Sequence, residues 1–318
     1  MKRFCGHLGA IAFLGVASAI GYAQSTERPD ILNKVVAASK KLRYSGIRKV
    51  HMKFGPDVVQ HTEYILKDGM KTRISFPDAG SFRGQIIVET ENERRHYFPD
   101  RNQIEIMPPR REEYFMRIGR LGGGKSPVKY LVENGEDVAG QNSKRVSMIS
   151  SSNRPFMKMW IDPNTGLVLK RVVYDREGNP QATSEFVKVD YRPSFKKSDF
   201  ELNLPGAKVV TPRDRLQEMV QRGGFQSVAF SPKDPYKLES VRIQRIENVS
   251  ALVQVYVKSD GRVSLYQVKA AIDPSRLKPR GRGTRYSTYS WTRGEASFVL
   301  VGELPEAKLR ELATKLGG

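Results

Sequence analysis

The chain has little that could support catalysis by cysteine or histidine. It contains one cysteine, Cys5, and four histidines among 318 residues. Cys5 lies in an N-terminal segment that we expect to be removed, so the mature chain has no cysteine for a disulfide, a nucleophile or a metal ligand. His51, His61 and His96 then remain, and none follows residue 96. Stability must therefore come from a buried core, and catalytic options are few.

The N-terminal segment has the pattern of a secretory signal peptide. Lys2 and Arg3 form a basic start, residues 8–20 are apolar and uncharged, and small residues end the segment at Ala23. The apolar run is too short to anchor the chain in a bilayer, and Cys5 precedes it, so it is no lipoprotein cysteine. We expect cleavage after Ala23 and export of the mature protein.

Acidic residues are few relative to basic ones. The chain has 54 Lys and Arg against 34 Asp and Glu, and loss of the signal peptide lowers the formal net charge from +20 to +18. In an exported chain this balance favours anionic lipid headgroups, lipopolysaccharide-like surfaces or an acidic protein as partner, rather than nucleic acid. The alternative, a basic exported protein without an anionic partner, stays open.

The hydrophobic pattern predicts one helix followed by many short strands. Apolar residues recur at helical spacing over residues 29–42, and the period becomes two after Gly46. Short turns separate the strands, so the sheet is expected to be antiparallel. After a hairpin around Gly55, the predicted strands are Lys71 to Phe76, Gln85 to Thr90, Arg94 to Phe98, Gln103 to Met107, Lys144 to Ser150, Phe156 to Ile161, Leu167 to Tyr174 and Thr183 to Tyr191.

Helices interrupt this sheet, and a second domain follows it. Helical spacing over residues 112–121 and a Ser126-Pro127 start signal predict two short helices, the second ending at Gly135. We place a signal peptide at 1–23, a large domain at 24–205 and a small α+β domain at 206–318. The fold class is mainly β (α+β), with a large antiparallel curved sheet or half-barrel that helices plug.

The first hairpin carries two histidines. If the turn pairs Phe54 with Val58, then His51 lies opposite His61 on the polar face of the sheet. Two imidazoles could hold a metal or sense pH, but no third ligand is evident nearby. We therefore expect a solvated sheet face and no metal site.

Residues 119–126 match the phosphate-loop pattern Gly-x-x-x-x-Gly-Lys-Ser. That loop requires a buried strand before it, whereas residues 111–118 are charged and have helical spacing. A glycine hinge between two helices is the better interpretation. No serine lies in a recognisable nucleophile elbow, the potential metal ligands lack the required spacing, and paired carboxylates such as Glu112-Glu113 are expected on an exposed helix face. The sequence thus predicts no enzyme and no cofactor.

A loop in the small domain concentrates positive charge. It has five cations within ten residues and no acid among them, and Pro279, Gly281 and Gly283 interrupt it. An anion- or partner-binding surface and a merely solvated connection are both consistent with this pattern. The candidate partner-binding residues are Arg276, Lys278, Arg280, Arg282 and Arg285.

Several short motifs resemble the MucB/RseB family, periplasmic regulators of an envelope-stress sigma factor. No single motif is diagnostic, but both domains are covered in the expected order. The segments that carry the resemblance are Tyr-Ser-Gly at 44–46, His-Tyr-Phe-Pro at 96–99, Trp-Ile-Asp-Pro-Asn-Thr-Gly-Leu at 160–167, Asp-Arg-Glu-Gly at 175–178, Val-Tyr-Val-Lys-Ser-Asp-Gly at 255–261 and Val-Leu-Val-Gly-Glu-Leu-Pro at 299–305.

The resemblance implies a larger domain like the lipoprotein carriers, whose curved sheet encloses an apolar cavity for lipid or lipidated protein. The strand alternation allows such a cavity here, and methionines suit a cavity that adapts to acyl chains. An ordinary packed core has the same alternation. The candidate cavity residues are Ile74, Phe76, Ile86, Val88, Ile104, Ile106, Met157, Met159, Ile161, Leu167 and Leu169.

The resemblance also implies a partner and a location. It predicts a non-enzymatic periplasmic protein that binds a membrane-anchored anti-sigma factor and senses lipid or lipoprotein acyl chains. The alternative is a periplasmic lipid or lipoprotein carrier without a signalling role, which would not need the second domain.

Overall fold

A computed structural model describes residues 27–78, 80–109, 128–151, 153–246, 248–258, 261–269 and 286–318. These residues form two sheets and three α-helices, so the protein is mainly β, as the sequence predicts. The predicted helices at 112–121 and at the start of 126–135, the glycine segment 119–126 and the five loop cations at 276–285 lie outside the described residues.

The larger sheet has 12 strands in the order β12-β6-β5-β4-β3-β2-β1-β11-β10-β9-β8-β7. Its neighbouring strands pair antiparallel, including β1 and β11, which lie far apart in the sequence; the exception is β12, which runs parallel to β6. The strands are β1 (Arg43–Phe54), β2 (Asp57–Asp68), β3 (Lys71–Ser75), β4 (Ile86–Glu89), β5 (Arg94–Phe98), β6 (Gln103–Met107), β7 (Lys129–Asn134), β8 (Lys144–Ile149), β9 (Pro155–Ile161), β10 (Val168–Tyr174), β11 (Pro180–Asp190) and β12 (Lys208–Val210).

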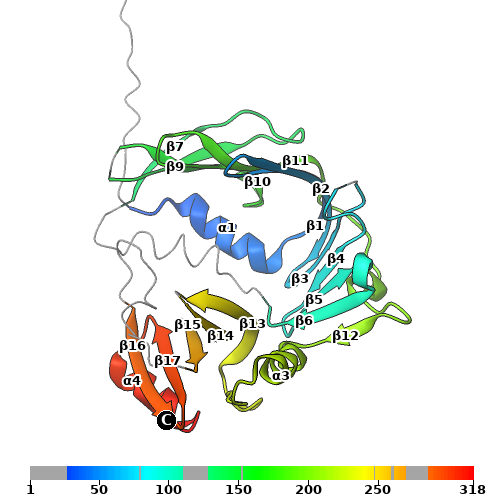
Figure 1. Cartoon of the computed structure of the whole chain (residues 1–318). Helices are drawn as coiled ribbons and strands as arrows, with labels where there is room; N and C mark the ends of the chain where they lie inside the picture. The colour runs from blue at the N-terminus through cyan, green and yellow to red at the C-terminus, as the bar shows by residue number, and fades with distance from the viewer. Residues whose placement is uncertain are drawn as a thin grey trace, which may run out of the picture.

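Helix α1 (Asp30–Lys41) lies inside the curve of this sheet (Figure 1). Its apolar residues recur at helical spacing, so one face of the helix can be buried. Leu32 and Val35 on that face pack with Met148 and Met159 of the sheet. The hydrophobic pattern therefore determines which side of α1 meets the sheet, and α1 fills part of the concave side.

Strand β7 corrects the sequence prediction of a helix over residues 126–135. Lys129–Asn134 pairs antiparallel with β8, from Lys129 opposite Ile149 to Asn134 opposite Lys144. The apolar residues Val128, Leu131 and Val132 fit helical spacing, but so short a segment fits a strand as well. Pairing with a buried neighbouring strand decided the outcome, because tertiary contacts outweigh a weak local preference.

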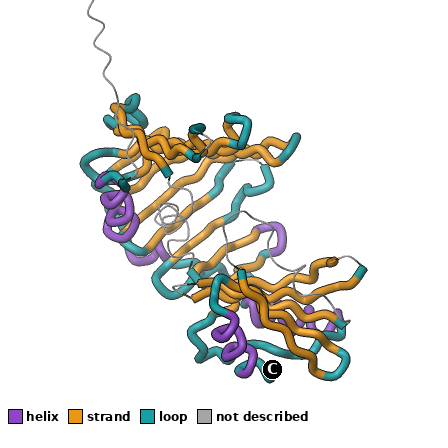
Figure 2. The backbone as a smooth tube through the Cα atoms, turned by 90° about the vertical axis from the view of Figure 1, so that its left-hand side faces the viewer, coloured by secondary structure: helices purple, strands orange, loops and turns teal. Residues whose placement is uncertain are grey.

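The smaller sheet has five strands in the order β13-β14-β15-β17-β16, and it lies beside the larger sheet (Figure 2). Helices α3 (Pro212–Gly223) and α4 (Glu306–Thr314) cover one of its faces. Thr211 caps α3 through Asp214, and Gly224 ends it with φ of +58°. The strands are β13 (Lys237–Ile246), β14 (Val249–Lys258), β15 (Gly261–Val268), β16 (Ser287–Arg293) and β17 (Ala296–Gly302).

Strand β12 connects the two parts of the chain. Lys208, Val209 and Val210 pair with Gln103, Ile104 and Glu105 of β6, directly before α3 begins. This strand follows the domain boundary that the sequence suggests at residues 205 and 206, yet it belongs to the larger sheet. The division at that boundary stays a prediction.

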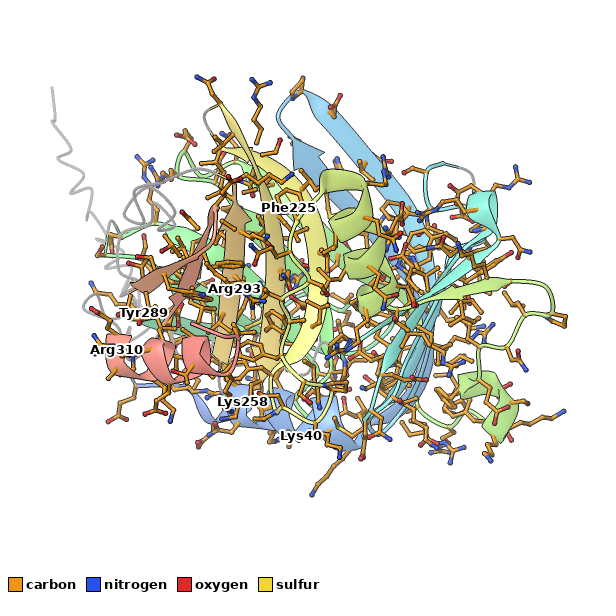
Figure 3. All side chains as sticks on the ribbon, turned by 60° about the horizontal axis from the view of Figure 1, so that its bottom comes forward. Lys40, Phe225, Lys258, Tyr289, Arg293 and Arg310 are labelled. Carbon is orange, nitrogen blue, oxygen red and sulfur yellow. The ribbon has the colours of Figure 1, made fainter. Side chains whose placement is uncertain are left out.

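Three cations of the smaller domain are labelled in Figure 3. Lys258 ends β14, Arg293 ends β16 and Arg310 lies on α4, where its guanidinium is 5.5 Å from the ring centre of Tyr289. These side chains come from three different elements.

Candidate functional site

The larger sheet has an inner face, on which α1 lies, and an opposite outer face. Side chains alternate between the two along each strand, and residues paired across an antiparallel ladder share a face. Met159 faces α1 and pairs with Arg171, which in turn pairs with Ser184 opposite Val50. The inner face can be followed in this way from β9 to β1 and on to β6.

The candidate cavity residues do not share one face. Ile74 pairs with Ile87 and is an inner residue, so the neighbouring Ile86 and Val88 are outer residues. Val88 and Ile104 pack with Leu202, because the segment after the short 3₁₀ helix η2 (Lys197–Phe200) covers the outer face of these strands. The inner candidates are Ile74, Phe76, Met157, Met159, Ile161 and Leu169, and the outer ones are Ile86, Val88, Ile104 and Ile106.

The inner candidates form two groups. Met157, Met159 and Ile161 pack beneath α1, and Met159 and Ile161 are fully buried there. Leu169, together with Leu167 just before β10, joins a second cluster around Tyr44, Ile65 and Phe186, which Ile74 borders. The first group is thus covered by α1, and an acyl chain could reach it only if α1 moved.

The first hairpin places an ion pair, not two histidines, on the inner face. Its turn pairs Phe54 with Asp57, so Arg48 lies opposite Glu63 and Val50 opposite His61. His51 pairs with Gln60 and points to the outer face, which makes the predicted histidine pair wrong. The turn has two residues, Gly55 and Pro56, rather than three, and this shift of one residue reverses the face of every side chain after it.

Glu63 is buried between a cation and an imidazole. Its Oε2 lies 2.5 Å from Nη2 of Arg48, and its Oε1 lies 3.2 Å from Nε2 of His61. The His61 ring packs against Phe76 and Phe82, with ring centres at 5.4 and 4.7 Å, and those two rings stack on each other at 5.5 Å. With a two-residue turn at Gly55 and Pro56, the sequence alone would place Arg48 opposite Glu63. The sequence analysis missed this ion pair because it assumed a three-residue turn.

Further charges lie on the inner face two rows beyond Glu63, past the row of Ile65 and Ile74. Lys67 pairs with Thr72, which pairs with Glu89, and Glu89 pairs with Arg94. Arg94 is buried, and its Nε lies 3.7 Å from Oε2 of Glu89. Burial lowers the pKa of Lys67, and the nearby Glu89 offsets part of that effect. This part of the inner face therefore carries buried charges beside apolar residues such as Ile65 and Ile74.

A turn after β9 holds α1 against the sheet. Asp162 accepts hydrogen bonds from the Tyr191 hydroxyl at 2.6 Å, the Thr165 hydroxyl at 2.8 Å and the Asn164 amide at 2.8 Å. The turn ends at Gly166, whose φ is +78° and whose Cα packs against the backbone of Lys34 in α1. Lys34 also donates from Nζ to the Pro163 carbonyl at 2.9 Å.

The hydrogen bonds to Asp162 make the stability of the fold depend on pH. Burial alone would raise the pKa of Asp162, but the hydrogen bonds from Tyr191, Thr165 and the turn amides outweigh it and hold the pKa below its ordinary value of 3.8. A carboxyl with a lowered pKa stabilises the fold above its ordinary pKa and loses that effect as pH falls through the lowered value. Burial and the bond to Asp162 raise the pKa of Tyr191, so its hydroxyl remains a donor.

We expect Asp162→Asn to lower the free energy of unfolding by about 1–3 kcal/mol at pH 7, because buried groups lose charge-assisted bonds. The difference from the wild type should shrink as pH falls below about 4, where the wild-type carboxyl is protonated. Urea unfolding across this pH range measures it. Asp175→Asn, in an exposed turn of similar sequence, is the control and should cost less. An equal loss for both variants would contradict the role of burial.

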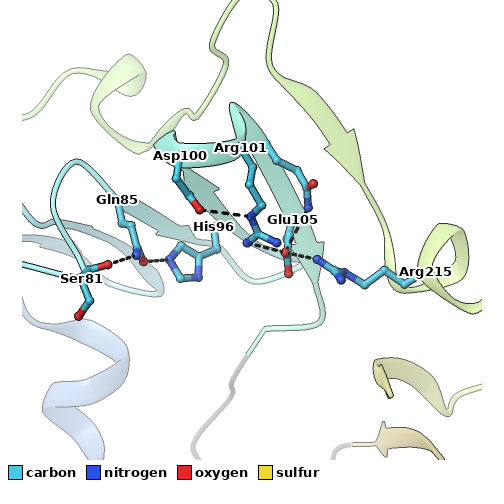
Figure 4. Close-up of polar contacts among 8 residues, drawn as sticks. Ser81, Gln85, His96, Asp100, Arg101, Glu105 and Arg215 are labelled. Carbon is cyan, nitrogen blue, oxygen red and sulfur yellow. Dashed lines mark hydrogen bonds and ion pairs between the residues drawn. The ribbon is translucent and has the colours of Figure 1, made fainter. Parts of the chain in front are cut away.

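A second polar cluster lies where the larger sheet meets the smaller domain (Figure 4). Glu105 of β6 accepts hydrogen bonds from Arg101 at 3.3 Å and from Gln103 at 3.2 Å, and Arg215 of α3 contacts the same carboxylate oxygen. Nearby, Nε2 of His96 lies 2.8 Å from Oε1 of Gln85. The amide nitrogen of Gln85, Nε2, donates a hydrogen bond to the Ser81 carbonyl. Glu105 therefore ties the last antiparallel strand to α3.

The described residues offer no group of three histidine, cysteine, aspartate or glutamate side chains that could hold a metal ion. In the same ranges, no helix is long and apolar enough to cross a membrane. The polar clusters above are ion pairs and hydrogen bonds between side chains of the sheet, the turns and α3.

Comparison with known proteins gives one family and several solved structures. A family model described as the MucB/RseB N-terminal domain matches residues 28–204. No curated protein matches the chain significantly. The segments noted at 44–46, 96–99, 160–167 and 175–178 all fall within the matched residues.

Similar solved structures share little sequence with this chain. The MucA/MucB complex of Pseudomonas aeruginosa is 12% identical, covering 89% of this chain and 96% of that one, with a TM-score of 0.44. An uncharacterised conserved protein of Thermus thermophilus is 18% identical, covering 57% and 97%, with a TM-score of 0.41. A LolA superfamily protein of Nitrosomonas europaea is 15% identical, covering 54% and 96%, with a TM-score of 0.30.

Proposed function

This chain belongs to the MucB/RseB family, and we propose that it is a periplasmic regulator that binds a membrane-anchored anti-sigma factor and senses lipid or lipoprotein through the inner face of its larger sheet. Family membership over residues 28–204 is the observation that carries this proposal. In the Pseudomonas aeruginosa complex, the partner of MucB is MucA. The predicted signal peptide supports the location.

The inner face supports the sensing part of the proposal. One part carries buried apolar residues that pack against α1, including Met159 and Ile161. Another part carries Arg48, Lys67 and Arg94 with their acidic neighbours. An acyl chain suits the first part and a polar headgroup or peptide the second, so α1 would act as the element that ligand displaces.

A lipid or lipoprotein carrier without a signalling role is the alternative. The apolar surface beneath α1 favours it, because a carrier needs that surface and nothing more. The smaller domain favours the regulator. It has its own buried core and is tied to the larger sheet by Glu105 and Arg215, neither of which a carrier requires.

Binding to the periplasmic segment of the single-span anti-sigma factor encoded in the same genome tests the regulator. We expect the purified mature protein to bind that segment in biolayer interferometry and to protect it from proteolysis. If this protein also senses lipid, added phospholipid micelles should release the bound segment. A protein that loads lipid but never binds the segment would be a carrier.

Val173→Gln tests the apolar part of the inner face, because Val173 lies opposite Met157 there and is a partly buried neighbour of the group beneath α1. Loss of one apolar contact should weaken binding of a fluorescent fatty acid about 5- to 30-fold. Val209→Gln is the matched control, since Val209 is an exposed apolar residue of the edge strand β12. Equal affinity of the Val173→Gln variant and the wild type would place the lipid elsewhere.

A further inference from the structure

The outer face of the larger sheet carries a group of lysines that the proposed function does not use. The sheet curves around α1, so this face is convex, and β1 and β11 lie in the middle of the strand order (Figure 1). Central strands of a convex sheet protrude furthest. The outer lysine patch consists of Lys49, Lys53, Lys158, Lys170 and Lys188.

The register brings these lysines together. Lys170 pairs with Glu185, which pairs with Lys49, so the three share one row on the outer face. Lys188 pairs with Ile47 in a neighbouring row. Among the described residues, the carboxylates of Glu185 and Glu136 contact the patch, at 3.3 and 3.4 Å from Nζ of Lys170, against five lysines. Positive charge therefore exceeds negative charge on the patch.

The arginines of the same face are engaged within the protein. Arg145 pairs with Glu133, Arg73 donates to the carbonyls of Asp199 and Glu201, and Arg95 pairs with Glu93. Lys49, Lys53 and Lys188 are exposed and have no acidic partner among the described residues. Arginine suits fixed bidentate recognition, whereas lysine presents a mobile, hydrated point charge. The free cations are thus of the type that suits a diffuse anionic surface.

Isolated apolar side chains lie among the lysines. Tyr64 pairs with Ile47 and is 45% exposed, Val187 precedes Lys188 at a bulge and is 47% exposed, and Val58 pairs with Lys53 and is 52% exposed. A tyrosine with its ring exposed next to cations has the composition of a membrane–water interface. The three are separated by polar positions and do not form one apolar patch of the kind that a protein partner buries.

We infer that the outer lysine patch is a docking surface for a bilayer rich in anionic phospholipid. Lysine ammonium groups near such a surface are attracted by its negative potential, and the attraction is screened over about 10 Å at 0.1 M salt. Tyr64, Val58 and Val187 would enter the headgroup region. Docking through the convex face would leave the inner face and the smaller domain free for their own ligands, so this surface is independent of the function proposed above.

Sedimentation with vesicles tests the patch. Vesicles of phosphatidylethanolamine with phosphatidylglycerol should bind the mature protein, vesicles of phosphatidylcholine should not, and binding should fall as salt rises. The triple variant Lys49→Gln, Lys53→Gln, Lys188→Gln should lower the partition coefficient about 10- to 100-fold. Thermal unfolding of the variant should match the wild type, since the substituted lysines are exposed.

The control has the same charge change in the smaller domain. Lys233, Lys237 and Lys315 are exposed lysines there, and their replacement by Gln should reduce binding by less than the patch variant does. A second comparison replaces the five loop cations at 276–285 by Ser. If the loop variant loses vesicle binding and the patch variant keeps it, the inference is wrong.

An acidic protein partner gives a different pattern. In that case the wild type would not distinguish the two kinds of vesicle, and the patch variant would instead bind the anti-sigma segment more weakly. That result would overturn the membrane assignment while leaving the proposed function intact. The membrane assignment would also be wrong if the patch variant lost binding to the anti-sigma segment without any change in its binding to vesicles.

Discussion

Placing a carboxylate under α1 with Val35→Asp should lower the free energy of unfolding by about 3–5 kcal/mol and release the helix from the sheet. Val35 is 3% exposed and packs with the apolar inner residues. A buried carboxylate without a partner loses its hydration and gains nothing in return, so the helix is expected to detach. Urea unfolding followed by circular dichroism measures the loss.

The same variant should bind a fluorescent fatty acid more strongly than the wild type, because the surface beneath α1 becomes accessible. Ala37→Asp is the matched control. It adds the same charge to an exposed position of the same helix and should change both measurements little. If Val35→Asp lost stability without any gain in fatty-acid binding, α1 would be a permanent part of the core, and the proposed displacement by ligand would be wrong.

Gly166→Ala should cost about 2–4 kcal/mol. A Cβ at this position would lie 2.6 Å from the carbonyl oxygen of Lys34 and 2.7 Å from its carbonyl carbon. The neighbour is helix backbone, so the turn or α1 must shift, and the positive φ adds strain of its own. The melting temperature and the urea midpoint should both fall, and proteolysis near α1 should become faster.

Gly178→Ala separates the two causes. Gly178 also ends a turn that begins with an aspartate, and its φ is +94°, but a Cβ there meets nothing within 4 Å. Its substitution carries the backbone strain alone and should cost about 1 kcal/mol. The difference between the two variants measures the contact with α1. Equal losses would show that Gly166 serves only its own turn.

The elements that the sequence predicts well are those with a strong local signal. The period of apolar residues over residues 29–42 gives α1. The short turns between alternating segments give the antiparallel order of the larger sheet. Each of these signals lies within one element or its two neighbours, so no long-range contact is needed to interpret it.

Residues 129–134 and the first hairpin show where local signals fail. The first segment is short enough to fit either period, and pairing with β8 made it a strand. In the hairpin, a turn shorter by one residue replaced the expected histidine pair with Arg48 and Glu63. Alternation within one strand does not show which of its side chains share a face with those of the next strand, because the turn between them can be longer or shorter by one residue.

The sequence by itself determined the mainly β class and the helix at the start of the larger domain. Periodicity and turn chemistry are local, which is why they could be interpreted from the chain alone. Only the tertiary structure decided which candidate residues share a face, that α1 covers part of the apolar inner face, and that the free lysines gather on the outer face. Those properties depend on strand register and packing between residues far apart in the chain, and register is set by the whole sheet.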